Sequence, residues 1–363
     1  APQMEEDPRF LTEQIVTYLG NKRSLLHFLG TGLEQVKKRL GKERLKAGDL
    51  FSGSGIVARF LKQHSEELIV NDLEEYSRVV NTCYLSNAEE VENLELDRHY
   101  RRLLRYMETH ESPGFITELY APRNPDCITA DDRVFYTRRN AVYLDTARQT
   151  INLLPAEIRP YFIAPLLAEA SVHTNTSGVF KGFYKDRNGI GKFGGTGGNA
   201  LSRILGDISL PFPVFSRFSI HCRDANELAA ELPEMDVVYL DPPYNQHPYG
   251  SNYFMLNLLS SYEKPEETSR VSGIPADWKR SMYNSRQHAP EALFRLLEDC
   301  PAKFILLSYS SEGFINYEEM TGFLGRLGRT VTLETPYAAF RGSRNFRNRP
   351  QNVTEFLFLV ERF

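Results

Sequence analysis

An acid, two prolines and a tyrosine stand directly after an apolar run in the second half of the chain. Asp241, Pro242, Pro243 and Tyr244 follow Met235–Leu240, which reads as a buried strand. The prolines remove two backbone N–H donors and stiffen the turn, so a carboxylate and carbonyls remain as acceptors. Such a cluster suits an exocyclic amino group, which presents two donors, and Tyr244 can stack on a base, worth about 1–3 kcal/mol. We therefore take these four residues as candidate catalytic residues over the competing interpretation of a rigid surface turn.

A glycine-containing turn near the start of the chain predicts a nucleoside site. The run Ala47–Leu61 reads as strand, turn and amphipathic helix, and Gly53 and Gly55 let the backbone approach a ligand at the helix N-terminus. A second predicted strand leads into Asp72, 19 residues after Gly53, where a carboxylate can accept both hydroxyls of a ribose. The pattern D-x-F-x-G-x-G differs from the G-x-G-x-x-G of dinucleotide enzymes, so it suits a nucleoside that carries an amino acid.

Positive charge gathers in two stretches, although the net charge of the chain is −4. Residues 178–223 hold seven basic residues and two acids. The basic ones are Lys181, Lys185, Arg187, Lys192, Arg203, Arg217 and Arg223. Residues 341–349 hold Arg341, Arg344, Arg347 and Arg349 and no acid. A solvated basic face explains either stretch alone, whereas both together suit a groove that follows phosphates.

Short apolar runs alternate with helical periodicity along most of the chain. The predicted strands are Gly48–Phe51, Glu67–Asn71, Phe218–Cys222, Met235–Leu240, Lys303–Tyr309, Arg329–Glu334 and Thr354–Val360. The predicted helices are Ser24–Leu40, Gly55–Gln63, Glu74–Ser86, Asp97–Thr109, Leu153–Val172 and Pro290–Asp299. This order favours an α/β fold with a doubly wound, mostly parallel seven-stranded sheet. No convincing helix joins the last two strands, so we expect the final strand to run antiparallel at the end of the series.

The alternation breaks once, between about residues 88 and 215. That stretch shows helical patterning, then the glycine-rich Gly189–Gly198, and no clear core strand. We predict a catalytic and cofactor-binding domain of residues 1–87 and 216–363, with 88–215 as a largely helical insertion and candidate target-recognition region. Residues 262–288 read as a long loop, and loops of that length are often functional.

Cysteine usage and hydropathy bound the class of protein. Cys83, Cys127, Cys222 and Cys300 lie far apart and form no metal-ligand spacing, so we expect no metal site and a reduced cytoplasm. No apolar run approaches the roughly 20 residues of a membrane span, and the acidic N-terminus does not read as a secretory signal. A soluble intracellular protein without a membrane partner is the expectation.

In order along the chain, these motifs resemble those of DNA adenine methyltransferases of the Dam type. The matching residues are Tyr18-Leu19-Gly20-Asn21-Lys22, Asp49–Gly55, Asp72 and Asp241–Tyr244, and the likeness covers roughly residues 10–85 and 215–363. The resemblance implies a Rossmann-like fold and transfer of a methyl group from S-adenosyl-L-methionine to the exocyclic amine of an adenine flipped out of double-stranded DNA. It also implies a cytoplasmic, nucleoid-associated enzyme, with a cognate restriction endonuclease as a candidate partner.

The resemblance assigns roles to individual residues. Tyr18 and Lys22 are expected at the methionine end of the cofactor and Asp224 at its adenine amine, while Tyr253 and Phe254 shape the cofactor and base pockets. The full expected cofactor set is Tyr18, Asn21, Lys22, Asp49, Phe51, Ser52, Gly53, Ser54, Gly55, Asp72, Asp224, Tyr253 and Phe254. The expected DNA contacts are Lys181, Lys185, Arg187, Lys192, Arg341, Arg344 and Arg347.

Other functions explain fewer of these residues. Methylation of cytosine at carbon five needs a cysteine after a proline, whereas Cys300 precedes Pro301 and no Pro-Cys pair occurs. RNA adenine, guanine or protein glutamine methylation more often resembles Asn-Pro-Pro-Tyr, so Asp241 favours DNA adenine, then the exocyclic amine of DNA cytosine, with RNA adenine as a further alternative. A non-catalytic nucleic-acid-binding module gives no reason for Asp241 or Asp72. A nicotinamide dehydrogenase lacks its G-x-G-x-x-G.

Overall fold

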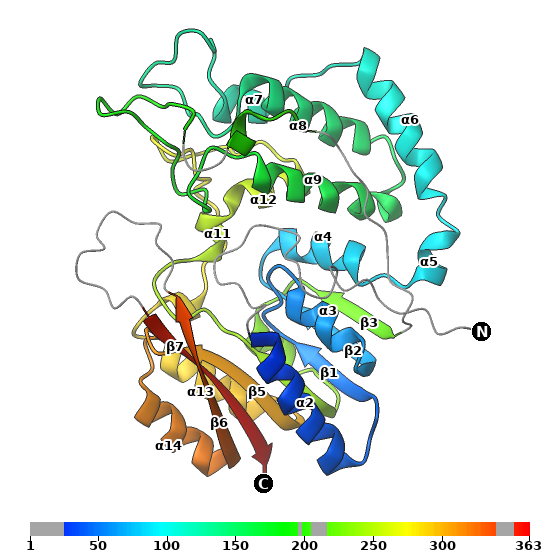
Figure 1. The fold of residues 1–363 in the computed structure, drawn as a ribbon, viewed down its shortest axis with the longest axis vertical. Helices are drawn as coiled ribbons and strands as arrows, with labels where there is room; N and C mark the ends of the chain where they lie inside the picture. The colour runs from blue at the N-terminus through cyan, green and yellow to red at the C-terminus, as the bar shows by residue number, and fades with distance from the viewer. Residues whose placement is uncertain (1–24, 195–197, 205–215, 339–351) are drawn as a thin grey trace.

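A single seven-stranded sheet forms the lower half of the molecule as drawn in Figure 1. The computed structural model describes residues 25–194, 198–204, 216–338 and 352–363. The strands are β1 (Leu45–Asp49), β2 (Ser65–Asn71), β3 (Arg217–His221), β4 (Met235–Leu240), β5 (Ala302–Ser310), β6 (Gly328–Ala338) and β7 (Asn352–Arg362). Every predicted strand has its counterpart within a few residues, and the order across the sheet is β3-β2-β1-β4-β5-β7-β6.

The last strand runs antiparallel, as predicted, but it does not end the sheet. β3, β2, β1, β4 and β5 pair in parallel, and β7 pairs antiparallel with both β5 and β6. Helix α14 (Tyr317–Leu327), which we did not predict, carries the chain from β5 to the sheet edge and leaves a gap beside β5. β7 fills that gap, and its consecutive buried residues Leu357–Val360 suit a strand covered on both faces.

Helices cover both faces of the sheet, which makes it doubly wound as predicted. α2 (Leu26–Leu40) and α3 (Ile56–Lys62) pack on one face, in one apolar cluster with alternate strand residues such as Phe304 and Leu306. α10 (Ala225–Ala229), α13 (Ala289–Asp299) and α14 pack on the other face with the intervening Ile305 and Leu307. Because successive residues of a strand point to opposite faces, each central strand is apolar throughout.

A helical part lies above the sheet in Figure 1. It contains α5 (Ala88–Glu92), α6 (Leu96–Thr109), α7 (Phe115–Tyr120), α8 (Arg138–Ile151) and α9 (Pro160–Val172). These helices share one apolar cluster with α4 (Glu75–Tyr84) and α12 (Phe254–Ser261), while α11 (Tyr249–Asn252) leads into α12. Segments from both sides of residues 88–215 therefore complete this core, and the division of the chain into domains stays a prediction.

Several helices of this part differ from the predicted ones, since α5, α7 and α8 were not predicted and α9 begins later than predicted. The helix predicted over Leu153–Val172 begins only at Pro160, after a 3-10 turn at Ala156–Ile158, because proline favours the first turn of a helix. Helix α8 was not predicted because its buried face includes polar side chains such as Asn140, Asp145 and Arg148. Its apolar residues therefore do not form a continuous stripe.

Asp145 ties three segments together inside the helical part. Its Oδ2 accepts hydrogen bonds from the Gly114 and Thr117 amides, both at 2.8 Å, and from the Thr117 hydroxyl at 2.6 Å. Its Oδ1 accepts from the Ile116 amide at 3.2 Å and the Tyr262 hydroxyl at 2.6 Å. The carboxylate thus satisfies the first amides of α7 and fixes the start of the loop 262–288.

We expect Asp145→Ala to lower the free energy of unfolding by about 3–5 kcal/mol, because several buried donors lose their acceptor together. Tyr262→Phe removes only one of these hydrogen bonds and should lower it by about 1 kcal/mol. Urea unfolding followed by circular dichroism measures both. Equal losses in the two variants would contradict the role given to Asp145.

Candidate active site

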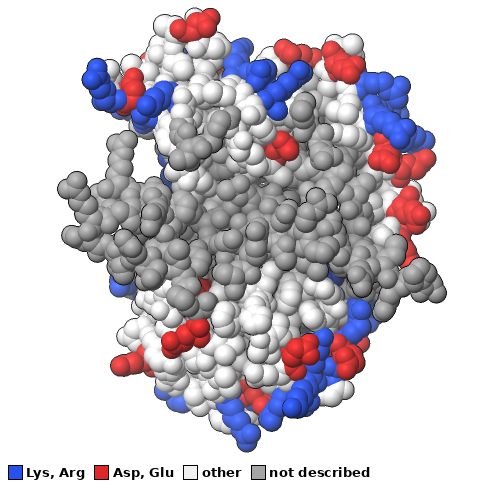
Figure 2. Space-filling model, in the orientation of Figure 1, with Lys and Arg blue, Asp and Glu red and all other residues white. Residues whose placement is uncertain are grey.

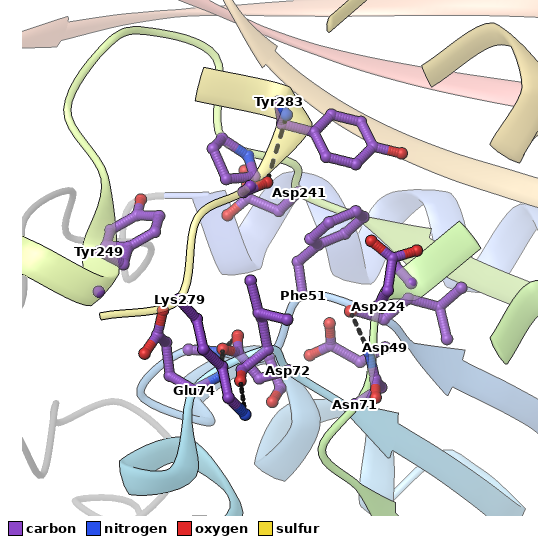
Figure 3. A pocket seen from close by; sticks show the side chains of 18 of the residues that line it. Asp49, Phe51, Asn71, Asp72, Glu74, Asp224, Asp241, Tyr249, Lys279 and Tyr283 are labelled. Atoms are coloured by element: carbon purple, nitrogen blue, oxygen red, sulfur yellow. Dashed lines mark hydrogen bonds between the residues drawn. The ribbon is translucent and has the colours of Figure 1, made fainter. Parts of the chain in front are cut away.

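A pocket opens at the carboxyl ends of the central strands (Figure 3). Its empty volume is about 900 Å³, part of which is open to solvent. Residues that follow β1, β2, β3 and β4 line it, together with Pro248–Gly250 and side chains from the loop 262–288. This is the edge at which open α/β sheets bind their ligands.

Side chains of α4 support the glycine turn after β1. Gly53 and Gly55 have φ of 53° and 82°, a left-handed region that favours glycine. A Cβ on Gly55 would lie 2.4 Å from Oδ1 of Asn81, and Asn81 donates to the Ser52 hydroxyl at 2.8 Å. Ser77 donates to the Gly53 carbonyl at 2.6 Å. Gly53 lines the pocket, whereas Gly55 caps α3 beside it.

Asp72 joins the glycine turn to the end of β2. Its Oδ2 accepts from the Gly53 amide at 2.9 Å, and its Oδ1 accepts from the Glu74 amide at 2.9 Å. Burial raises the pKa of Asp72, and these backbone hydrogen bonds oppose that rise. Gly53 and Asp72, which the sequence predicts to bind the same ligand, are thus in direct contact.

Asp49, the last residue of β1, is a fully buried acid on the pocket wall. Neither of its carboxylate oxygens has a hydrogen-bond partner among the described residues that meets distance and angle criteria. Burial, and then the negative charges of Asp241 and Asp72, raise its pKa well above the ordinary value, and the Phe51 amide offsets this only in part. Among the described residues, the Phe51 amide compensates this buried carboxyl group only in part, so a cationic ligand would stabilise its ionised form.

Negative charge dominates the rest of the wall. The lining contains Asp49, Asp72, Glu74, Asp224 and Asp241 against two cations, Arg223 and Lys279. Burial and Asp72 raise the pKa of Glu74 to about 7, although Asn257 donates to its carboxylate at 2.7 Å. Lys279 donates to the Leu73 carbonyl at 3.0 Å. The pocket is therefore suited to a ligand with positive charge.

Asp224 stands at the N-terminus of α10, on the wall where the sequence placed it. One of its carboxylate oxygens, Oδ1, accepts from the Asn226 and Glu227 amides at 2.9 and 3.1 Å. The cap fixes the side chain and leaves the other oxygen available to a ligand.

The candidate catalytic loop meets the pocket through Asp241 and Pro243. Pro242 is buried behind them, and Tyr244 is half-buried outside the lining, with its ring edge-on to Tyr309 at 6.3 Å. The Tyr244 carbonyl accepts from the Phe314 amide at 3.0 Å. Asp241 lies close enough to Asp49 for its negative charge to raise the pKa of Asp49. The candidate catalytic loop and the glycine turn therefore belong to one site.

The remaining expected cofactor residues fall into three groups. Phe51, Ser52 and Ser54 line the pocket. Tyr253 and Phe254 do not line it but are fully buried in the core of the helical part. Tyr18, Asn21 and Lys22 lie outside the described residues, as do three of the expected DNA contacts, Arg341, Arg344 and Arg347.

The loop 262–288 supplies pocket residues that the sequence did not single out. Lys279, Ser281, Tyr283 and Asn284 line the wall that faces the glycine turn. Tyr283 packs edge-on against Phe51 at 5.3 Å, and its hydroxyl donates to Oδ1 of Asn226 at 2.6 Å. The length and composition of the loop pointed to function, but no spacing distinguished these side chains within it.

Four of the expected DNA contacts lie on or beside a small hairpin of the helical part. Lys185 and Gly191 form an antiparallel bridge, and Asp186 accepts from the Asn188 and Ile190 amides at 2.8 and 3.0 Å. Lys181, Arg187 and Lys192 are exposed, and Nζ of Lys185 lies over the Phe183 ring at 5.0 Å. Charged side chains gather at the upper left of Figure 2, where Figure 1 draws the tip of this hairpin.

Two further features concern metals and membranes. Within the described ranges, no group of three or more His, Cys, Asp or Glu side chains is arranged to hold a metal ion. Among the same residues, no helix combines the length and the apolar character that crossing a membrane requires.

Known proteins resemble the chain over most of its length. A model of the family described as D12 class N6 adenine-specific DNA methyltransferase matches residues 18–323. The Type II methyltransferase M.CviAII of Paramecium bursaria Chlorella virus 1 is 28% identical over 355 residues, which cover 95% of this chain and 98% of that protein. M.NlaIII of Neisseria lactamica is 27% identical over 360 residues, 96% of this chain and 99% of that protein. M.FokI of Planomicrobium okeanokoites is 25% identical over 361 residues, 95% of this chain but 52% of that protein.

The raised pKa of Glu74 predicts a pH-dependent stability. Between its ordinary value of 4.5 and about 7, the folded protein holds this proton while the unfolded chain releases it, so stability falls as pH rises through that window and then levels. Glu74→Gln should remove the part of this slope that Glu74 contributes, worth about 3 kcal/mol, and leave the part that the raised pKa values of Asp49 and Asp72 contribute. Unfolding free energies of wild type, Glu74→Gln and the exposed control Glu66→Gln measure it across the window. An equal slope in wild type and Glu74→Gln would contradict the assignment.

Proposed function

The chain belongs to the D12 class N6 adenine-specific DNA methyltransferase family, and we propose that its pocket holds S-adenosyl-L-methionine beside the loop that receives adenine. The enzyme is a site-specific DNA adenine methyltransferase, which sets aside the cytosine, RNA and non-catalytic alternatives. The observation that carries the cofactor assignment is the buried, unpartnered Asp49 carboxyl group on the pocket wall next to Asp72 and Asp241.

The donor groups of this cofactor match acceptors along the wall. The Asp49 carboxylate binds the ammonium group of the cofactor's amino-acid end. This group supplies the positive charge and the hydrogen-bond donors for the Asp49 oxygens. Asp72 accepts from the ribose hydroxyls with lone pairs that the Gly53 and Glu74 amides leave unused. Asp224 accepts from the adenine amine through Oδ2, because its Oδ1 is engaged in the helix cap.

Charge supports the same assignment. The bound cofactor carries an ammonium and a sulfonium against one carboxylate, so its net charge is positive. Five acids and two cations line the pocket, and burial keeps their field strong. Tyr18, Asn21 and Lys22, expected at the methionine end, would contribute from the N-terminal segment.

The loop Asp241–Tyr244 prepares the target amine. When bound, the cofactor supplies an electrophilic methyl group on its sulfonium. Asp241 and the Pro242 carbonyl accept the two N–H bonds of the amine, which disfavours delocalisation of its lone pair into the ring and directs that pair at the methyl group. Most of the acceleration comes from this orientation, and Asp241 need not be a strong base, because the amine becomes acidic only as the new bond forms. Flipping the adenine out of the duplex costs a few kcal/mol. Tyr244 then stacks on the flipped base.

Double-stranded DNA lies, in this proposal, against the hairpin of Lys185 and the arginines of residues 341–349, whose charges neutralise phosphates. Residues 88–215 serve as the target-recognition region. We also propose a cytoplasmic, nucleoid-associated enzyme paired with a restriction endonuclease of the same specificity. The designation of M.CviAII and M.NlaIII as Type II methyltransferases supports the pairing.

Cofactor binding and chemistry should separate by mutation. Asp241→Ala should abolish methyl transfer and keep cofactor affinity within a few fold, because its carboxylate faces the target amine. Asp72→Ala should weaken cofactor binding by about 1.5–3 kcal/mol for each lost hydrogen bond to a charged group. Calorimetry with S-adenosyl-L-methionine and incorporation of labelled methyl groups into unmethylated genomic DNA measure the two effects.

Asp236→Ala is the matched control, because Asp236 lies near the start of β4, the strand after which Asp241 comes, where Lys42 donates to it at 2.9 Å. This variant should bind the cofactor and methylate DNA like wild type. Unchanged cofactor affinity in Asp72→Ala, or methyl transfer by Asp241→Ala at the wild-type rate, would overturn the assignment of the site.

A further inference from the structure

Residues 262–288, here called the strap, connect the helical part to the sheet across the pocket. At one end the Tyr120 hydroxyl donates to the Gly273 carbonyl at 2.7 Å, and Arg133 donates to the Ser269 carbonyl at 3.2 Å. At the other end Asn284 donates from Nδ2 to the carbonyl of Asn245, the residue after the catalytic loop, at 2.8 Å. The strap is therefore held at a fixed place over the site.

Successive side chains of the strap face opposite ways where it passes the pocket. Ser281 is extended, with φ of −113° and ψ of 138°, and side chains alternate in extended chain. Lys279 and Ser281 line the pocket, whereas Arg280 between them does not and is exposed. Met282 is 56% exposed. The strap thus turns one face to the cofactor pocket and another to solvent.

Two arginines on the solvent side are held in place by aromatic rings. The Arg280 guanidinium lies over the Trp278 ring at 4.2 Å from its centroid, and that of Arg286 lies over Phe314 at 5.0 Å. Within the described part of the chain, neither forms a salt bridge with an acid, and the sequence from Trp278 to His288 contains three Lys or Arg and no acid. Nη1 of Arg280 donates to the carbonyls of Trp278 at 2.9 Å and Ala276 at 3.4 Å, so Nε and Nη2 are the donors that we assign to a phosphate.

The strap that carries these arginines contacts both the basic hairpin and the segment behind the catalytic loop, which are the two ends of the expected DNA surface. Phe314, under Arg286, donates its amide to the carbonyl of Tyr244 in the catalytic loop at 3.0 Å. On the other side the Ser272 hydroxyl donates to the carbonyl of Lys181, at the base of the basic hairpin. The strap therefore runs from the hairpin to the loop that receives the base.

The basic side chains of α6 do not share this position. Arg101, Arg102 and Arg105 are exposed on α6, which Figure 1 draws at the outer edge of the helical part, and Lys and Arg side chains gather at the upper right of Figure 2. Asp97 and Glu108 lie on the same helix, and no residue of α6 lines the pocket. These arginines therefore lie outside the site.

We propose that Arg280 and Arg286 form a DNA-backbone contact at the mouth of the pocket and bind phosphates on either side of the target adenine. This inference rests on the proposed function and adds to it a contact surface outside the two basic stretches of the sequence. The arginines fix the position of the strand from which the base is extruded. Asn284 and Phe314 transmit that position to the catalytic loop.

The test compares binding of a 30-base-pair random-sequence duplex across a salt series. Arg280→Ala and Arg286→Ala should each reduce the magnitude of the slope of log affinity against log salt by about 0.9, the value for one phosphate, and the double variant by about 1.8. Arg286→Lys keeps the charge and should keep the slope. Arg326→Ala is the matched control, since Arg326 is exposed and lies over the Phe323 ring at 5.7 Å at the end of α14.

Two accompanying measurements separate this inference from the proposed function. Affinity for S-adenosyl-L-methionine should be unchanged in every variant, which shows that the fold and pocket are intact. If wild type methylates genomic DNA and both alanine variants bind the duplex with the wild-type slope, the strap contact is wrong and the proposed function stands. If wild type transfers no methyl group to DNA, the proposed function fails and this inference fails with it. A loss of slope in Arg326→Ala equal to that in Arg286→Ala would also overturn the contact, because charge alone would then explain it.

Discussion

The close approach of several acidic side chains at the carboxyl edge of the sheet is the constraint on which the site depends. Asp49 ends a central strand with no exposed surface, and Asp241 and Asp72 stand close enough to raise its pKa. Such an arrangement is unfavourable in the free protein, because each carboxyl group loses water and repels the others. In the proposed function, a cationic cofactor would stabilise the ionised carboxylates, and this electrostatic attraction would contribute to its affinity.

The fold holds these acids in place from several directions. Parallel strands bring Asp49, Asp72 and Asp241 to one edge of the sheet, although 23 or more residues separate them in sequence. Helix α4 fixes the glycine turn through Asn81 and Ser77, and the strap closes the remaining wall. The same strap binds the backbone next to the candidate catalytic loop through Asn284, which links the wall proposed for the cofactor to that loop.

The sequence predicted what local patterns encode and missed what only packing encodes. Each strand followed from the apolar runs, and the spacing singled out Gly53 and Asp72, which the structure shows in contact. The place of β7 inside the sheet depended on α14, whose pattern was not recognised, and α8 buries polar residues that hide its periodicity. Tyr283 and Lys279 reach the pocket from a loop with no regular pattern. Tyr253 and Phe254, expected near the cofactor from resemblance alone, pack instead in the helical core.

Proton release during cofactor binding tests the central claim most directly. Titration calorimetry with S-adenosyl-L-methionine at about pH 6, in two buffers of different ionisation enthalpy, counts the protons exchanged. If Asp49 is partly protonated in the free protein and ionised against the ammonium group, wild type releases protons to the buffer and binds more tightly as pH rises. Asp49→Asn should bind more weakly and release fewer protons. Equal affinity and equal proton release in the two proteins would contradict the account.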